Sequence, residues 1–193
     1  LLPRGACSGG YSFIMTGCPA TNMLVSTYMK DLMKKTKPSH AYEAIKRNHA
    51  PGGMMSYESA DDLKFYVKKG YCPGNAGKTL EWAFQDWGLS RMALRMGKKS
   101  DAVLYEKRSR AWTPLFNKNI GLILPKKENG EWLHTDPLNG QGWVEANAWQ
   151  ATWSVSHDLP KLVELMGGGD AFCEKLNYAF EQARPTDFVH AYS

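Results

Sequence analysis

Apolar residues recur every three or four positions along most of this chain, which is the period of an α-helix. Glycine and proline interrupt the pattern at intervals and mark the loops between helices. We therefore expect a mostly helical protein. The expected helices cover residues 19–35, 40–48, 60–69, 75 or 78 to 96, 100–116, 158–166 and 170–183, with a further helix that begins at about residue 145.

The helix that ends at Met96 has the clearest signals, because Gly97 follows it and glycine readily adopts the left-handed backbone of a helix end. Its expected inner stripe is Leu80, Phe84, Trp87, Arg91 and Leu94. For the next helix, capped by Ser100, the expected inner face is Leu104, Arg108, Ala111 and Leu115, widened by Val103, Trp112 and Phe116. In the last helix, capped by Asp170, the expected shared face is Phe172, Leu176, Ala179, Phe180 and Ala183.

The helical period is lost between residues 117 and 142. Residues 121–125 form a short strand-like run, Asn129-Gly130 is a hairpin-turn signal, and residues 131–134 form a second run. Helical hairpins in series suit a solenoid or an (α/α)6 toroid, but a complete toroid needs more helices than the pattern provides. We therefore expect an all-α fold that is part of an (α/α)6 toroid, with a short β-like excursion near residues 120–135.

The composition is that of an ordinary globular chain, with 43% hydrophobic and 22% charged residues among 193. The net charge of +5 comes largely from scattered lysine pairs at probable turns and helix ends, not from a basic stripe, so we do not expect nucleic-acid binding. No apolar run is long enough to span a membrane. The four cysteines include no C-x-x-C pair, which disfavours a zinc ribbon. Because the chain starts without methionine, we expect it to be a piece of a longer polypeptide.

Residues 143–158 form the densest polar and aromatic segment. A helix from Glu145 would place Glu145, Trp149 and Trp153 on one face, at spacings of four. Indole rings would desolvate the carboxylate and raise its pKa, and a carboxyl that stays protonated can donate a proton to a glycosidic oxygen. The spacing equally fits an acidic residue in the first turn of a helix and two core tryptophans, so both interpretations stay open.

Three stretches of the chain carry a family resemblance. The sequence E-A-N-A-W-Q-A-T-W-S-V-S-H-D at residues 145–158, followed by L-V-E-L-M-G-G at 162–168, is similar to the E-G-N-A-W-Q-Y-T-W…H-D…L-I-x-L-M-G-G block of glycoside hydrolase family 92. Residues 75–87 are similar to its A-S-x-T-L-E-Y-A-Y-D-D-W segment, and residues 2–4 to its L-P-R-W. Ala146 stands where the family has glycine, and Gly5 where it has tryptophan, which puts sugar contacts near the N-terminus in doubt.

The resemblance implies a bacterial, calcium-dependent, inverting exo-α-mannosidase. It implies that residues 1–193 are part of an (α/α)6 catalytic domain, with the preceding β-sandwich domain and the C-terminal part of the toroid outside the chain. Glu145 would be the general acid, and Glu81 and Asp86 would be scaffold carboxylates, with sugar contact the alternative. The expected substrate-binding residues are Asn147, Trp149, Gln150, His157 and Asp158, of which the last two also fit a helix N-cap.

The same resemblance places the catalytic base and most calcium ligands outside this chain. We therefore expect hydrolysis of terminal α-linked mannose (α-1,2 as the favoured linkage) from glycans by the longer protein, and no activity from residues 1–193 alone. The expected location is the periplasm, the cell surface or the medium. Because a partial toroid leaves apolar faces uncovered, we also expect a large apolar patch or a surface through which two chains pair.

Two alternatives remain at this point. A different α/α-toroid glycosidase or a sugar epimerase would be calcium-independent and would act on other sugars, such as glucosides. A helical carbohydrate-binding or scaffold module would bind mannose without hydrolysing it.

Overall fold

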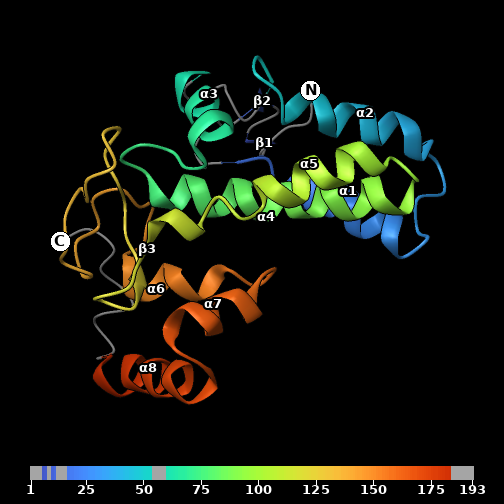
Figure 1. The fold of residues 1–193 in the computed structure, drawn as a ribbon. Coiled ribbons are helices and arrows are strands. Elements are labelled where there is room, and N and C mark those ends of the chain that lie inside the picture. Colours follow the sequence, from blue (N-terminus) through green and yellow to red (C-terminus); the bar gives the residue numbers. More distant parts are fainter. Residues whose placement is uncertain (1–5, 8–9, 12–16, 54–59, 184–193) are drawn as a thin grey trace. The chain divides into compact units, whose positions relative to one another are not determined.

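The computed structural model describes residues 6–7, 10–11, 17–53 and 60–183, and its elements are labelled in Figure 1. Its contacts divide the chain into two compact units. The first comprises residues 1–72 and 78–111, and the second comprises residues 73–77 and 112–193. The fold is mostly helical, as predicted, and each unit is described by itself below. The motif at residues 2–4 lies outside the described residues.

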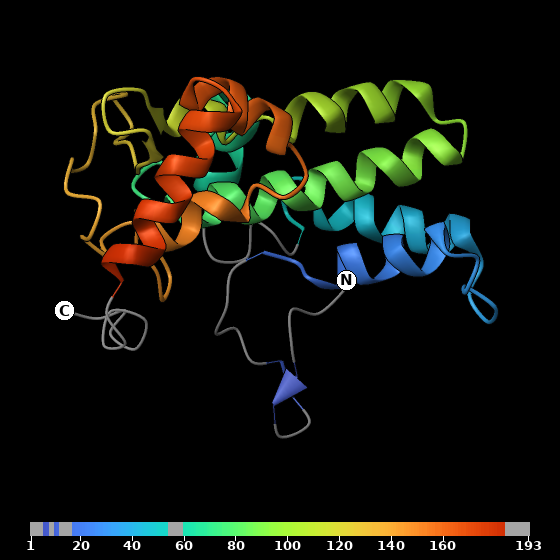
Figure 2. The same cartoon turned by 90° about the horizontal axis from the view of Figure 1, so that it is seen from below.

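The described residues of the first unit form a short β-ribbon and five helices. Strands β1 (Ala6–Cys7) and β2 (Gly10–Tyr11) are antiparallel, with Ala6 opposite Tyr11. The helices are α1 (Ala20–Met29), α2 (Pro38–Asn48), α3 (Ala60–Lys69), α4 (Ala76–Arg95), whose first two residues belong to the second unit, and α5 (Lys99–Arg108). Figure 2 shows α1 and α2, and likewise α4 and α5, as two antiparallel hairpins. The prediction of helical hairpins in series is thus confirmed for this unit.

One apolar core joins the two hairpins. Its buried members are Val25, Ala41, Tyr42, Ile45, Leu89, Met92, Ala93, Ala102 and Tyr105. They come from α1, α2, α4 and α5 at spacings of three and four, so each helix contributes one face. Burial of these side chains supplies the main driving force that holds the hairpins together.

Helix α1 ends at Met29, six residues earlier than the sequence pattern indicates. The Arg95 guanidinium donates hydrogen bonds to the carbonyl oxygens of Tyr28 (3.1 Å) and Met29 (2.6 Å) and to Asp31 Oδ1 (2.7 Å). Asp31 has a left-handed backbone with φ of 57°. The Arg95 side chain thus satisfies the last carbonyl groups of α1, which a helix end leaves without partners.

The inner faces predicted for α4 and α5 are correct only in part, since Leu80, Ala111, Trp112, Leu115 and Phe116 are buried as predicted. Leu94 is 56% exposed and Val103 is 71% exposed, whereas Trp82 and Met92 of α4 and Ala102 of α5 are buried. Helix α4 is buried on most of its circumference by several neighbouring elements, so an apolar stripe does not mark its inner side. The long helix predicted over 100–116 stops at Arg108 and gives way to turns and extended backbone.

The second unit begins with a 3-10 turn, η2 (Thr113–Leu115), which has a proline in its first turn. Strands β3 (Phe116–Asn117) and β4 (Leu122–Ile123) then pair antiparallel, with Phe116 opposite Ile123. A bridge between Lys126 and Trp132 continues the excursion around Gly130, whose φ is 88°. The predicted β-like excursion and its turn are confirmed, although the first strand starts at 116, before the predicted range.

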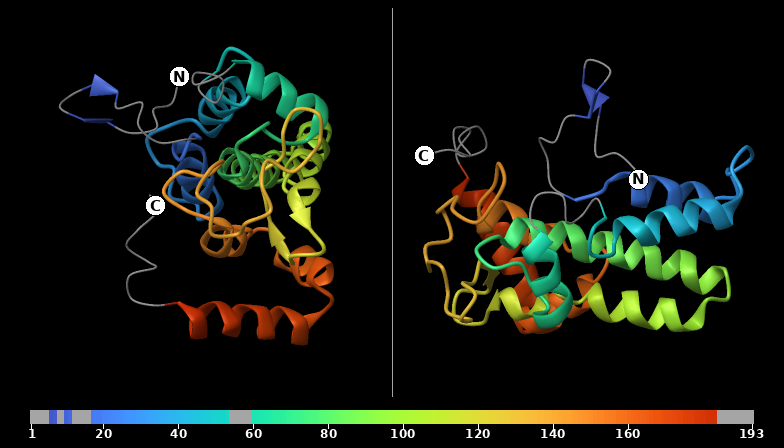
Figure 3. Two further views of the ribbon diagram at one scale, coloured as in Figure 1. Left: turned by 90° about the vertical axis from the view of Figure 1, so that its left-hand side faces the viewer. Right: turned by 90° about the horizontal axis from the view of Figure 1, so that it is seen from above.

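The described part of this unit continues with α6 (Ala148–Ala151), η3 (Thr152–Ser154), α7 (Leu159–Met166) and α8 (Gly169–Gln182). Gly167 and Gly168 have positive φ and make the turn from α7 into α8, which Figure 3 shows. Asp170 therefore lies in the first turn of α8 and does not cap it.

None of the residues of α8 is buried, and Tyr178 and Phe180 are 51% and 66% exposed. The expected large apolar patch and the pairing of two chains through it stay predictions. None of the described helices is long and apolar enough to cross a membrane.

Candidate active site

Glu145 lies in a loop of the second unit and not in a helix, so the predicted helix start at residue 145 is wrong. Its φ of 53° is left-handed, and its side chain is exposed. A left-handed residue other than glycine cannot open an α-helix, so the predicted shared face of Glu145, Trp149 and Trp153 does not form. The expected burial of the Glu145 carboxylate against indole rings is also not observed.

The backbone is fixed on both sides of Glu145. Before it, Trp143 is buried and its N–H donates to the Gly140 carbonyl (3.1 Å), and the Gly142 carbonyl accepts from Ala76 N–H (2.8 Å). After it, the N–H of Ala148 donates to the Pro137 carbonyl (3.1 Å). These bonds hold the two ends of a short segment whose middle residue is Glu145.

Asn147 and Gln150 form a reciprocal capping box at the start of α6. The Gln150 N–H donates to Asn147 Oδ1 (3.2 Å), and the Asn147 N–H donates to Gln150 Oε1 (3.0 Å). Both side-chain amide oxygens are therefore engaged in holding the helix start. In this structure the two predicted sugar-binding amides fix the backbone directly after Glu145.

Trp149 and Trp153 pack against α8. The ring of Trp149 lies 5.6 Å from that of Tyr178, and Lys175 Nζ lies 5.0 Å from the Trp149 ring centroid. Trp153 meets Phe172 edge to face at 5.6 Å and donates its indole N–H to the Trp149 carbonyl (2.6 Å). These contacts support the interpretation of Trp149 and Trp153 as packing residues. Both rings nevertheless remain partly exposed.

Asp158 occupies the N-cap position of α7, as predicted, but its side chain makes no capping hydrogen bond. Its backbone carbonyl accepts from the N–H groups of Lys161 (3.1 Å) and Leu162 (3.2 Å). Within the described part of the chain, the buried Oδ2 of Asp158 has no hydrogen-bond partner. His157 precedes it and is partly buried.

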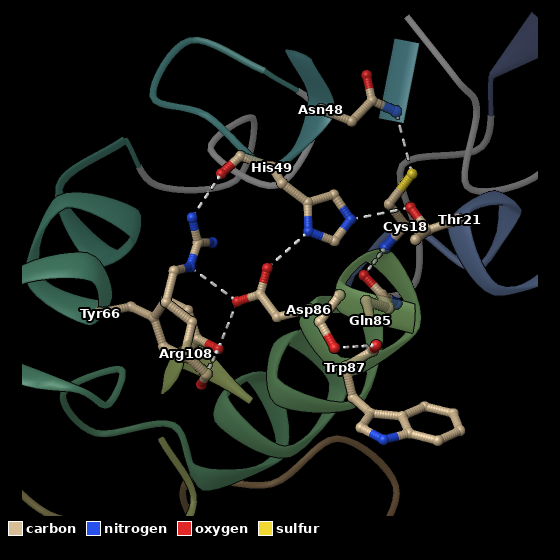
Figure 4. Close-up of polar contacts among 10 residues, drawn as sticks. Cys18, Thr21, Asn48, His49, Tyr66, Gln85, Asp86, Trp87 and Arg108 are labelled. Atoms are coloured by element: carbon tan, nitrogen blue, oxygen red, sulfur yellow. Dashed lines mark hydrogen bonds and ion pairs between the residues drawn. The ribbon is translucent and has the colours of Figure 1, made fainter. Parts of the chain in front are cut away.

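In the first unit, Asp86 on α4 is fully buried and accepts three side-chain hydrogen bonds (Figure 4). The partners are His49 Nδ1 at 2.8 Å to Oδ1, and Tyr66 Oη and Arg108 Nε, each at 2.9 Å to Oδ2. His49 Nε2 lies 2.9 Å from Thr21 Oγ1 on its other side. The interpretation of Asp86 as a scaffold carboxylate is thus confirmed.

This cluster joins side chains from α1, α3, α4 and α5 and from the end of α2. The Thr21–His49–Asp86 geometry is that of a hydrolase triad, but all three residues are 0% exposed, so no substrate reaches the hydroxyl. The sequence analysis did not single out His49, Tyr66 or Thr21. The signal in the sequence that could have revealed this cluster was Arg108, which lies on the expected apolar face of its helix. A cation on such a face requires a buried anion beside it.

Glu81 lies one turn before Gln85 on the same helix and is only partly buried. The Gln85 amide donates to Glu81 Oε1 (2.5 Å), and its own Oε1 accepts from the N–H of Cys18 (2.8 Å). Burial raises the pKa of the Glu81 carboxyl, and the bond from Gln85 offsets part of that rise. Gly17 packs directly on this pair with φ of 74°.

Calcium binding needs six to eight oxygen ligands. Among the residues that the structure describes, no three histidine, cysteine, aspartate or glutamate side chains are grouped as a metal site.

Comparison with known proteins identifies the class. The profile of the glycosyl hydrolase family 92 catalytic domain matches residues 1–192. The chain belongs to this family.

Solved and curated relatives agree. The inverting mannosidase BT2199 of Bacteroides thetaiotaomicron VPI-5482 is 30% identical, with a TM-score of 0.80, over 89% of this chain and 24% of that one. The family GH92 alpha-mannosidase BT3965 of Bacteroides thetaiotaomicron is 24% identical, with a TM-score of 0.84, over 96% and 25%. An uncharacterized secreted glycosidase of Arthroderma benhamiae is 24% identical over 89% of this chain and 27% of its own length. The chain thus spans about a quarter of each relative.

Proposed function

We propose that this chain supplies the proton donor of an exo-acting, inverting α-mannosidase that removes terminal α-linked mannose from glycans. The observation that carries the proposal is the left-handed, exposed Glu145, held between the buried Trp143 and the capping box of α6. A left-handed residue other than glycine costs roughly 1–2 kcal/mol, and such strained residues cluster at active sites. Without a function for its carboxylate, a glycine would serve better at this position.

In this proposal Glu145 protonates the departing glycosidic oxygen. An inverting reaction also needs a carboxylate base roughly 6.5–9.5 Å from the acid, on the other side of an attacking water. We propose that the base and the calcium ligands lie outside residues 1–193. Asn147 and Gln150 fix the backbone after Glu145 and, with Trp149, His157 and Asp158, are the proposed pocket residues.

The mannosidase names of BT2199 and BT3965 support mannose as the sugar. The secreted relative supports a location outside the cytoplasm, in the periplasm, at the surface or in the medium. The α-1,2 linkage, the toroid and calcium dependence remain parts of the proposal that rest on the family resemblance.

The decisive test replaces Glu145 with Gln in the longest natural polypeptide that carries this chain. For mannosides whose leaving group needs protonation, kcat should fall about 10²–10⁴-fold, which is the usual contribution of a general acid. An aryl mannoside with an activated leaving group should be hydrolysed at nearly the wild-type rate. Glu164→Gln is the matched control, because Glu164 is exposed in the same unit and pairs with Lys161 on the surface.

Equal losses on both substrates would reject the acid assignment for Glu145. Mannose binding without hydrolysis by the wild-type polypeptide would reject the enzyme and favour a binding module.

A further inference from the structure

Helix α4 carries two carboxylates with opposite surroundings. Asp86 is fully buried and meets the Arg108 guanidinium and two further donors. Glu81 is partly buried, and in the described part of the chain no cation pairs with it. The same helix therefore holds one compensated and one uncompensated carboxylate.

An uncompensated carboxylate is costly to withdraw from water, because burial penalises its charged form. A glutamine would make the same hydrogen bond to its neighbour without that penalty. Retaining a glutamate here stabilises neither α4 nor the core, and such sites are enriched in functional groups. Glu81 thus has the energetic character of a ligand-binding residue, unlike Asp86.

The surroundings also fix its orientation. Gln85 is fully buried, and the backbone N–H of Cys18 holds its amide oxygen, so the amide can present only its NH₂ group to Glu81 Oε1. A Cβ on Gly17 would lie 2.4 Å from Glu81 Cγ and 2.6 Å from Gln85 Nε2. Gly17 thus leaves the space that this arrangement needs, and its left-handed φ independently favours glycine.

Oε2 of Glu81 is the acceptor left over. Within the described chain, this oxygen is not one of the polar atoms that are buried without a hydrogen-bond partner. The Glu81 side chain is also partly exposed. A fixed carboxylate with one accessible oxygen matches a neutral ligand rich in hydroxyl donors, since bonds from hydroxyl groups to a charged acceptor are short and strong.

We propose that Glu81 is a substrate-binding residue that accepts a hydrogen bond from a mannose hydroxyl through Oε2, with Gln85 and the Cys18 N–H positioning it. The proposal rests on the proposed mannosidase function.

The test compares Glu81→Gln with wild type in the longest natural polypeptide that carries the chain. Three quantities are measured, namely the Kd for mannose by calorimetry, the KM and kcat for a mannoside, and the thermal midpoint of unfolding. Loss of one charged hydrogen bond should raise Kd and KM about 10- to 100-fold. The thermal midpoint should stay equal or rise, because the variant no longer buries a charge. Glu43→Gln, exposed on α2 of the same unit, should change none of these quantities.

Unchanged Kd and KM in Glu81→Gln would overturn the proposal, as would a loss of binding accompanied by a lowered thermal midpoint, which a structural role produces. A wild-type polypeptide that binds mannose without hydrolysing it would refute the proposed function alone, and the Kd of Glu81→Gln would still decide the role of Glu81. A wild type that neither binds nor hydrolyses mannosides would refute both.

Discussion

Replacing Asp86 with Asn should be severely destabilising, although the two side chains have nearly the same volume. Asp86 is the only carboxylate that meets the Arg108 guanidinium within the described chain, and the Arg108 side chain is only 11% exposed. Removing one partner of a buried ion pair costs about 3–5 kcal/mol, because it leaves the other charge uncompensated. The Asn amide would also point donors at groups that now donate to a carboxylate.

The loss is large against a typical total stability of about 5–15 kcal/mol. For a protein of this size, each 1 kcal/mol corresponds to roughly 2–4 °C, so the thermal midpoint should fall by about 6–20 °C. Urea unfolding followed by tryptophan fluorescence measures the free energy directly. The double variant Asp86→Asn/Arg108→Met should be more stable than Asp86→Asn alone, because the unpaired cation is gone.

A loss below about 1 kcal/mol for Asp86→Asn would refute this reasoning, since that is the typical value of one neutral hydrogen bond. Additive costs in the double variant would refute it equally, because partners in one network do not behave independently.

Of three further predictions, two follow from the structure and the third from the family resemblance. Glu145→Gly should stabilise the protein by about 0.5–1 kcal/mol in urea unfolding, because glycine removes the strain of φ 53°. The same variant should lose general-acid catalysis, because it has no carboxyl group. Glu145→Ala keeps the strain and should show no gain in stability. Burial raises the pKa of the Glu81 carboxyl in the folded state. The stability that comes from its protonated form is therefore lost as the pH rises from the ordinary pKa of 4.5 through the folded-state pKa. Glu81→Gln should therefore gain stability relative to wild type across that window, and a constant difference from pH 4 to 8 would contradict this. Chelation by EGTA should abolish mannoside hydrolysis by the longest natural polypeptide and added calcium should restore it, whereas full activity in EGTA would reject calcium dependence.

Local signals in the sequence were sufficient for most helix ends. Glycine at position 97 and the pair Gly167-Gly168 act through their own backbone preferences, which need no tertiary contacts. The end of α1 at Met29 was not predictable in this way. It depends on Arg95, which lies far away in sequence, so no pattern within the helix reveals it.

The inner faces of the helices were harder to predict than the helices themselves. An apolar stripe marks the buried side only when one side of a helix meets solvent. Helix α4 has neighbours around most of its surface, so polar side chains such as Gln85 and Asp86 are as fully buried as Trp82. The burial of Arg108 followed from one anion on another helix, which only the tertiary structure reveals.

The segment around Glu145 shows why spacing alone misplaced the candidate site. The period of four between Glu145, Trp149 and Trp153 is real, but it is interrupted by one left-handed residue and by a capping box that starts the helix at Ala148. The capping residues Asn147 and Gln150 are the same amides that the family resemblance assigned to sugar binding. The same residues thus fix the helix start, and they leave Glu145 exposed at its entrance. A general acid must reach a substrate, so a fixed, exposed carboxylate outside the helix serves that chemistry better than the buried helical glutamate that the spacing indicated.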